Sequence, residues 1–281
     1  MDKFSEYNID NSELQLRINE IVNRKLNNSQ LEQIKRLILG VIDLTTLSGD
    51  DNIEKVKNLC LKGISYNDNS NKIPNVAAIC VYPVFANLVS ETIKNTDIET
   101  ACVAGAFPSG LSPLSVRISE VEYAVAEGAS EIDMVISRGM LTEGDSDYVY
   151  KEVKQIKEAC GDAHLKVILE TGELKSIALI RKASEISIMA GADFLKTSTG
   201  KISPAATLDA FIIMLDTIKE YYNSTGKMIG IKAAGGISTF DEALKYYLLV
   251  EDVLGEKWLN KKYFRIGASR LADDVYNAII N

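Results

Sequence analysis

The stretch Phe194-Leu195-Lys196-Thr197-Ser198-Thr199-Gly200-Lys201 places a lysine inside an apolar, β-prone segment that ends in Gly-Lys. Lysine is rarely fully buried, because an apolar environment disfavours its charged form unless a partner compensates. The same anomaly recurs in Leu165-Lys166-Val167-Ile168-Leu169 and in Ile231-Lys232-Ala233. Packing alone does not explain three lysines in three successive apolar segments, so we take them as candidate functional residues.

Outward from this stretch, short apolar segments alternate with amphipathic segments at helical spacing. The expected strands are 41–45, 76–82, 101–106, 131–137, 164–170, 193–198, 230–233 and 263–267. The expected helices are about 52–62, 84–95, 113–128, 146–160, 174–190, 205–222, 239–250 and 269–280. Eight strand–helix units whose strands are almost continuously apolar predict a parallel sheet closed into a (β/α)8 TIM barrel.

A doubly wound open sheet is the competing architecture for such a repeat. Against it, the first expected strand is followed by Ser48-Gly49-Asp50-Asp51, and not by a G-x-G-x-x-G dinucleotide loop. No composition shift marks a domain boundary. We therefore expect one barrel domain over residues 39–281.

Residues 1–38 are predicted to form an N-terminal helical extension. Apolar residues recur at helical spacing over 11–38, and Asn27-Asn28-Ser29 interrupts them, with Ser29 as the expected N-cap of a second helix. The extension is expected to cover one end of the core or to join a partner subunit, which would make the protein a homodimer.

Composition limits the classes of function. The net charge of −8 argues against nucleic acid as a partner, because phosphate backbones need a basic face. No signal peptide and no run of about 18 apolar residues is present, so no membrane partner is expected. The four cysteines are far apart and form no C-x-x-C pair, which indicates structural thiols in a reducing cytoplasm.

The single histidine, His164, excludes further chemistry. A metal site built from several imidazoles is impossible, and a Ser-His-Asp triad would depend on this residue alone, with no G-x-S-x-G motif in the chain. No metal and no cofactor is expected.

Alternation along the strands brings the lysines together. One consistent choice of faces points Asp133, Lys166, Lys196 and Lys232 into the barrel. Neighbouring ammonium groups and burial should lower the pKa of at least one lysine, and a neutral amine attacks carbonyls to form a Schiff base. The alternative is that each lysine extends from a strand end to solvent, which explains one lysine better than three beside an aspartate.

Glycine-bearing loops follow the last three expected strands: Gly200-Lys201, Ala234-Gly235-Gly236 and Gly267-Ala268-Ser269. The second loop precedes a helix whose N-cap is expected at Ser238 or Thr239. Glycines let backbone N–H groups approach an anion, and helix N-termini favour negative charge. These loops therefore predict a phosphate site at the late strands of the barrel.

The chain closely resembles the deoxyribose-phosphate aldolases, which are metal-free Schiff-base aldolases with a (β/α)8 fold. The resemblance covers roughly residues 38–275, and its matching segments are Asp43-Leu44-Thr45-Thr46-Leu47, Ala77-Ala78-Ile79-Cys80-Val81-Tyr82-Pro83, Glu131-Ile132-Asp133-Met134-Val135, the run from Leu165 through Lys201, Lys232-Ala233-Ala234-Gly235-Gly236 and Phe264-Arg265-Ile266-Gly267-Ala268-Ser269.

The resemblance implies roles for the clustered residues. Lys196 would form the Schiff base with acetaldehyde, and Lys232 would stay protonated and lower the pKa of Lys196. Asp133 would relay protons with a water, and Lys166 would pair with Asp133 and shape the site.

The resemblance also implies a substrate site and a reaction. Asp43 and Thr45 would line the pocket near the sugar hydroxyls, and the other expected binding residues are Thr199, Gly200, Lys201, Gly235, Gly236, Gly267 and Ser269. The implied reaction, in deoxyribonucleotide catabolism, is reversible cleavage of 2-deoxy-D-ribose 5-phosphate to acetaldehyde and D-glyceraldehyde 3-phosphate. The expected partners are therefore small phosphorylated sugars and aldehydes.

The match departs from the family pattern at the phosphate site. Ile237 is followed by Ser238, where many members have arginine, and Arg270 stands where serine is common. Arg270 would replace the missing cation, or phosphate would bind more weakly. The loop 105–110 also differs slightly in composition.

Two other functions fit parts of the pattern. The lysines also permit a Schiff-base lyase or a transaldolase-like enzyme on another sugar phosphate. A catalytically silent sugar-phosphate-binding barrel would predict the loss of Lys196, Lys232 or Asp133, and all three are present.

Overall fold

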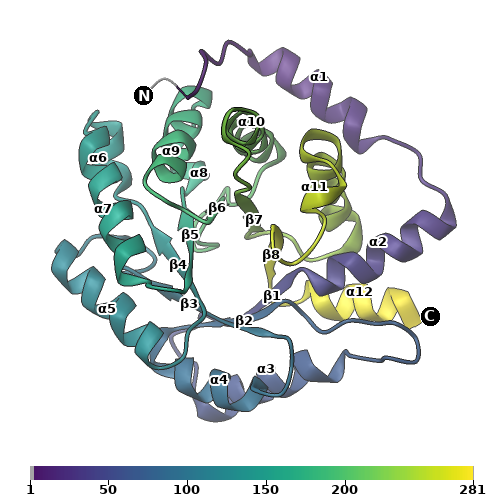
Figure 1. The fold of residues 1–281 in the computed structure, drawn as a ribbon. Helices are drawn as coiled ribbons and strands as arrows, with labels where there is room; N and C mark the ends of the chain where they lie inside the picture. Colours follow the sequence, from purple (N-terminus) through teal and green to yellow (C-terminus); the bar gives the residue numbers. More distant parts are fainter. Residues whose placement is uncertain (1–2, 281) are drawn as a thin grey trace.

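The centre of the computed structural model, which describes residues 3–280, is a closed barrel of eight parallel strands in the order β1 to β8 (Figure 1). The strands are β1 Ile42–Thr45, β2 Ala78–Val81, β3 Glu99–Ala104, β4 Glu131–Val135, β5 His164–Ile168, β6 Phe194–Lys196, β7 Gly230–Ala234 and β8 Phe264–Ala268. Because β8 pairs with β1, the sheet has no free edge. The prediction of a TIM barrel is confirmed, and the open sheet is excluded.

Helices follow the strands and surround the barrel (Figure 1). The main ones are α3 Ile53–Ser65, α4 Ala86–Ile93, α5 Leu114–Ala126, α7 Ser146–Ala159, α9 Ile177–Met189, α10 Leu208–Thr225, α11 Phe240–Leu254 and α12 Leu271–Ile280. Short helices also occur between strands: η1 Pro83–Phe85 lies at the start of the expected helix 84–95, whereas the sequence pattern does not predict α6 Arg138–Thr142, α8 Thr171–Leu174 and η2 Glu256–Trp258.

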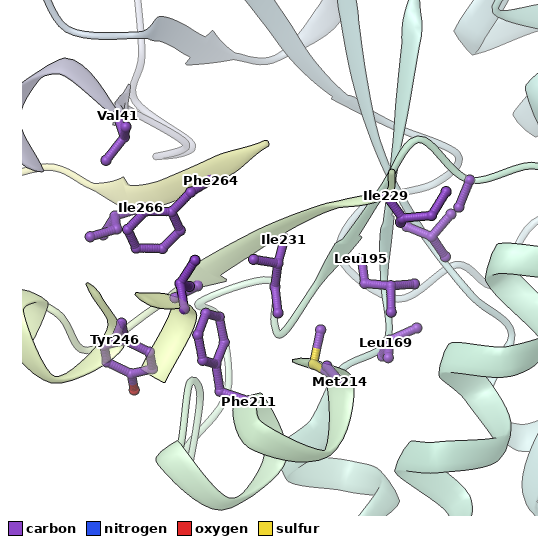
Figure 2. Close-up of a cluster of buried hydrophobic side chains, with 14 of the residues drawn as sticks. Val41, Leu169, Leu195, Phe211, Met214, Ile229, Ile231, Tyr246, Phe264 and Ile266 are labelled. Atoms are coloured by element: carbon purple, nitrogen blue, oxygen red, sulfur yellow. The ribbon is translucent and has the colours of Figure 1, made fainter. Parts of the chain in front are cut away.

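The main apolar core lies between the strands and the helices. Leu195 of β6 and Ile231 of β7 pack in the same cluster as Phe211 and Met214 of α10 (Figure 2). Full burial of each such side chain contributes about 1.5–3 kcal/mol. Side chains alternate along a strand. Because Leu195 and Ile231 face outward, their neighbours Lys196 and Lys232 face inward.

The N-terminal extension forms α1 Asn11–Val22 and α2 Asn28–Gly40. α1 packs against α10 and α11, and α2 packs against α12 and α11. The expectation of Ser29 as N-cap is wrong. Asn27 is the cap, because its side chain accepts a hydrogen bond from the Gln30 backbone while the Gln30 side chain accepts one from the Asn27 backbone. The proposed domain boundary at residue 39 stays a prediction, since α2 runs to Gly40.

The cysteines are ordinary members of the apolar core. All four cysteines are buried free thiols. Within residues 3–280, the helices are too short or too polar to cross a membrane.

Candidate active site

The barrel interior brings Asp133, Lys166, Lys196 and Lys232 together from four neighbouring strands. Register pairs Asp133 with Lys166 and Lys196 with Lys232. Asp133 Oδ2 accepts hydrogen bonds from Lys196 Nζ at 2.6 Å and from Lys232 Nζ at 2.7 Å, and Oδ1 accepts one from Lys166 Nζ at 3.1 Å. None of the four side chains is more than 3% exposed.

The three lysines differ in electrostatics. Burial, together with the positive charge of Lys232, lowers the pKa of Lys196 against the opposing attraction of Asp133. Burial also opposes the charge of Lys232, but Asp133 and Asp43 raise its pKa above the ordinary lysine range. Burial opposes the charge of Lys166 as well, but Asp133 and Glu131 raise its pKa. Lys196 is therefore the amine of the three that loses its proton most readily.

Glu131 and Arg265 are part of this cluster, although the sequence did not single them out. Glu131 Oε2 accepts a hydrogen bond from Lys166 Nζ at 2.5 Å, and Arg265 donates to Glu131 Oε1 at 2.7 Å. The available signal was the same as for the lysines: each is a charged residue on the inward face of an apolar strand. Glu131 lies two residues before Asp133, and Arg265 lies between Phe264 and Ile266.

Two expected substrate residues do not reach the cavity. Asp43 was expected beside the sugar hydroxyls, but its carboxylate is fully buried and accepts hydrogen bonds from Lys232 Nζ and from Arg265 Nη1. Lys166 is equally buried between Glu131 and Asp133. Neither side chain lines the cavity; both belong to the buried charged cluster.

A cavity of about 350 Å³ opens at the carboxyl ends of the strands, where Lys196 and Lys232 line it. The other predicted residues that line it are Thr45, Thr199, Gly200, Lys201, Gly235, Gly236, Gly267 and Ser269. Ser238 and Arg270, the two departures from the family pattern, line it as well. Ala234 and Ala268 of the predicted glycine loops also line the cavity, and the lining residues not predicted from the sequence are Thr46, Leu47, Ser48 and Ile237.

Gly200 and Gly235 bring two loops of this cavity into backbone contact. Both have positive φ angles, +76° and +90°. A Cβ atom on Gly235 would lie 2.6 Å from Ala205 Cβ and 3.0 Å from Gly200 Cα. Any side chain at position 235 would therefore push the two loops apart.

Other contacts fix the loop after β6. Glu170, whose φ is +55°, accepts hydrogen bonds from the backbone N–H of Thr199 at 3.2 Å and from its hydroxyl at 2.5 Å. Lys201 Nζ donates to the Leu47 carbonyl across the cavity mouth. The N-cap of α11 is Thr239, one of the two residues expected, and Ser238 is bound to Glu242 of the same helix.

A polar cavity at the carboxyl ends of the strands of a (β/α)8 barrel, lined by a buried amine of lowered pKa, is the arrangement of an enzyme active site. The chain belongs to the DeoC/LacD aldolase family, whose model matches residues 37–249. It is therefore an aldolase, and so a lyase.

Named relatives cover most of the chain. It is 43% identical over 251 residues to the deoxyribose-phosphate aldolase of Mus musculus and 42% identical to that of Homo sapiens; both matches cover 85% of this chain and 78% of the relative. A solved structure, titled a unique tetrameric structure of deoxyribose phosphate aldolase from Aeropyrum pernix, superposes with a TM-score of 0.67 at 25% identity, over 91% of this chain and 99% of that one.

Proposed function

We propose that the enzyme reversibly cleaves 2-deoxy-D-ribose 5-phosphate to acetaldehyde and D-glyceraldehyde 3-phosphate, with Lys196 as the Schiff-base lysine. The observation that carries this proposal is the position of Lys196: a buried amine of lowered pKa that still lines the cavity. The mouse and human relatives, which are named for this activity, support the choice of substrate.

The proposed reaction follows from imine chemistry. The neutral Lys196 amine attacks the C1 aldehyde of the open-chain sugar, and loss of water gives an iminium. A base removes the C3 hydroxyl proton, the C2–C3 bond breaks, and its electron pair forms an enamine while C3 becomes the aldehyde of glyceraldehyde 3-phosphate. Protonation of the enamine at C2 and hydrolysis then release acetaldehyde and restore Lys196.

Asp133 and Lys232 are proposed to move the protons. Asp133 remains ionised, because three lysines outweigh burial and hold its pKa well below the ordinary value. As a carboxylate it is proposed to orient the water that relays the protons. Lys232 remains a cation and shares Asp133 Oδ2 with Lys196, which places a proton donor beside the reacting nitrogen.

Substrate phosphate is proposed to bind at the glycine loops after β6, β7 and β8, where Lys201 and Arg270 supply positive charge. Both cations line the same cavity as Lys196. We also propose a cytoplasmic location, because four free thiols suit a reducing compartment. We further propose that the protein is a homodimer, which light scattering of the purified protein would check.

Borohydride trapping tests the function. Incubation with acetaldehyde and reduction should leave an N-ethyl group on Lys196, located by peptide mass spectrometry. Lys196→Leu should abolish both adduct and turnover while circular dichroism and melting temperature show a folded barrel. An adduct on Lys166 or Lys232 instead, or none, would refute the assignment. A panel of other aldehydes would show whether a different sugar phosphate is the better substrate.

A further inference from the structure

The charged side chains inside the barrel form a closed ring. Lys232 contacts Asp43 and Asp133, Lys166 contacts Asp133 and Glu131, and Arg265 contacts Glu131 and Asp43. Three cations and three carboxylates therefore alternate around one circuit, and each member has two partners of opposite charge. Such a ring is neutral when every member is ionised.

Lys196 stands outside this ring. Among the ion pairs of residues 3–280, it has a single carboxylate partner, Asp133, and shares Oδ2 of that partner with Lys232. When all the groups are ionised, the interior holds four cations and three carboxylates, and Lys196 is the surplus. Loss of its proton leaves the alternating ring intact, whereas loss of a proton from Lys166 or Lys232 breaks it.

We propose that Arg265 and Glu131 are positioning residues that close this ring and thereby select Lys196 as the amine that is neutral. The proposal rests on the proposed role of Lys196 and deepens it. Arg265 makes the closure possible, because its guanidinium reaches Asp43 Oδ1 and Glu131 Oε1, both at 2.7 Å. Without it, Asp43 and Glu131 would each keep a single cation.

In the described part of the chain, other titratable groups near Lys196 form no ion pair with it. Glu170, buried directly after β5, accepts its hydrogen bonds from Thr199. On β2, burial raises the pKa of the Cys80 thiol, so this thiol stays neutral. Lys201 and Arg270 line the open cavity, where solvent screens them. The pKa values agree with the ring: the pKa of each ring cation, Lys166, Lys232 and Arg265, is raised, and the pKa of Lys196 is lowered.

The pH dependence of borohydride trapping with acetaldehyde tests the ring. Glu131→Gln removes a carboxylate and leaves more positive charge around Lys196, so the pH of half-maximal adduct formation should fall by about one unit. Arg265→Gln removes a cation, so the midpoint should rise by about one unit. A merely structural role would lower the yield without moving the two midpoints in opposite directions.

Three further variants control the test. The double variant Glu131→Gln with Arg265→Gln keeps the charge balance but opens the ring, so that Lys166, like Lys196, has only Asp133 as a partner. Lys166 should then compete to lose the proton, and the midpoint should stay above the unmodified value; a return to that value would show that net charge, and not ring closure, selects Lys196. Arg265→Lys keeps the charge but cannot hold both carboxylates as the guanidinium does, so its midpoint should rise by less than one unit, and an unchanged midpoint would show that the charge alone matters. If Arg265→Gln fails to fold, this variant and Glu131→Gln still test the ring. Glu152→Gln breaks a buried ion pair with Arg117, 2.6 Å long, that lies outside the ring, and should lower the melting temperature only.

The outcomes separate the two proposals. Failure to trap Lys196 in the unmodified protein would remove the proposed function. An adduct on Lys196 whose midpoint is the same in Glu131→Gln, Arg265→Gln and Glu152→Gln would overturn the ring alone.

Discussion

A substitution at Arg270 tests the proposed phosphate site most directly. Arg270 is exposed, stands directly before α12 and lines the cavity together with Gly235 and Gly267. Ser238 is uncharged and is bound through its backbone N–H and its hydroxyl to Glu242. Positive charge on this side of the cavity therefore comes from Arg270 and not from position 238.

Arg270→Ala should raise KM for 2-deoxyribose 5-phosphate about tenfold, because a hydrogen bond to a charged group contributes about 1.5–3 kcal/mol. The KM for free 2-deoxyribose should change little. Steady-state kinetics on both substrates measures the difference, with Arg36→Ala on α2 as the control for loss of a surface arginine. Equal rises in KM for both sugars would show that Arg270 does not contact phosphate.

At the same scale, strand alternation predicted the cluster of three lysines and Asp133, because each lies among apolar neighbours. It did not single out Glu131 or Arg265, since a charged residue at or near a strand end is equally consistent with solvent exposure. The place of Asp43 beside the sugar hydroxyls was implied by the family resemblance and not by alternation; its side chain is buried below the cavity lining, because the choice between cavity and interior depends on which side chains meet across the barrel. Only the closed register brings Arg265 of β8 to Asp43 of β1.

Among the elements, the strands and long helices were predicted within a few residues, because apolar periodicity marks buried faces. The short helices α6 and α8 were not. Five and four residues are too few to show a period, and tertiary contacts hold such turns. α8 starts after Glu170, whose left-handed backbone is fixed by its contact with Thr199, and nothing local encodes that contact.

The segment before α1 binds the outer face of α9 and α10. Arg181 of α9 lies between the rings of Phe4 and Tyr7, at 5.2 and 5.0 Å from their centroids. The Tyr7 hydroxyl donates to Asp216 of α10 at 2.6 Å, and Arg17 donates to the same carboxylate. The extension thus joins the two helices that flank the strand of Lys196.

Tyr7→Phe should lower the melting temperature by about 2–3 °C, because it removes one hydrogen bond to a charged group and keeps the ring over Arg181. Calorimetry measures the change. Tyr123→Phe, at an exposed tyrosine of α5, is the matched control and should have no effect. If both variants melt alike, the Tyr7 contact with Asp216 adds nothing to stability.

At the scale of the whole molecule, the buried ring serves the proposed reaction at Lys196 more than it stabilises the fold. Removing several charges from water costs free energy that their mutual attraction only partly returns. The surrounding apolar shell between strands and helices provides the compensating stability (Figure 2). Because the sheet is closed, this shell continues all the way around the wall of the barrel.

This arrangement predicts loss of stability in acid. Despite burial, Lys232 and Arg265 hold the pKa of Asp43 below its ordinary value of 3.8, and the lysines do the same for Asp133. As pH falls, the unfolded chain therefore binds these protons before the folded protein does. The stabilisation is present above about pH 4 and decreases below it, by about 1.4 kcal/mol per pH unit for each carboxylate.

Urea unfolding between pH 7 and pH 3, at high salt to screen surface pairs, measures this dependence. Asp43→Asn should be less stable throughout, since it leaves Lys232 and Arg265 with one carboxylate each. Its free energy of unfolding should nevertheless fall less steeply below pH 4, because one linked proton is gone. Asp50→Asn, at an exposed aspartate on the loop after β1, is the control and should keep the original slope. Equal slopes for Asp43→Asn and the unmodified protein would mean that Asp43 is not ionised within the ring.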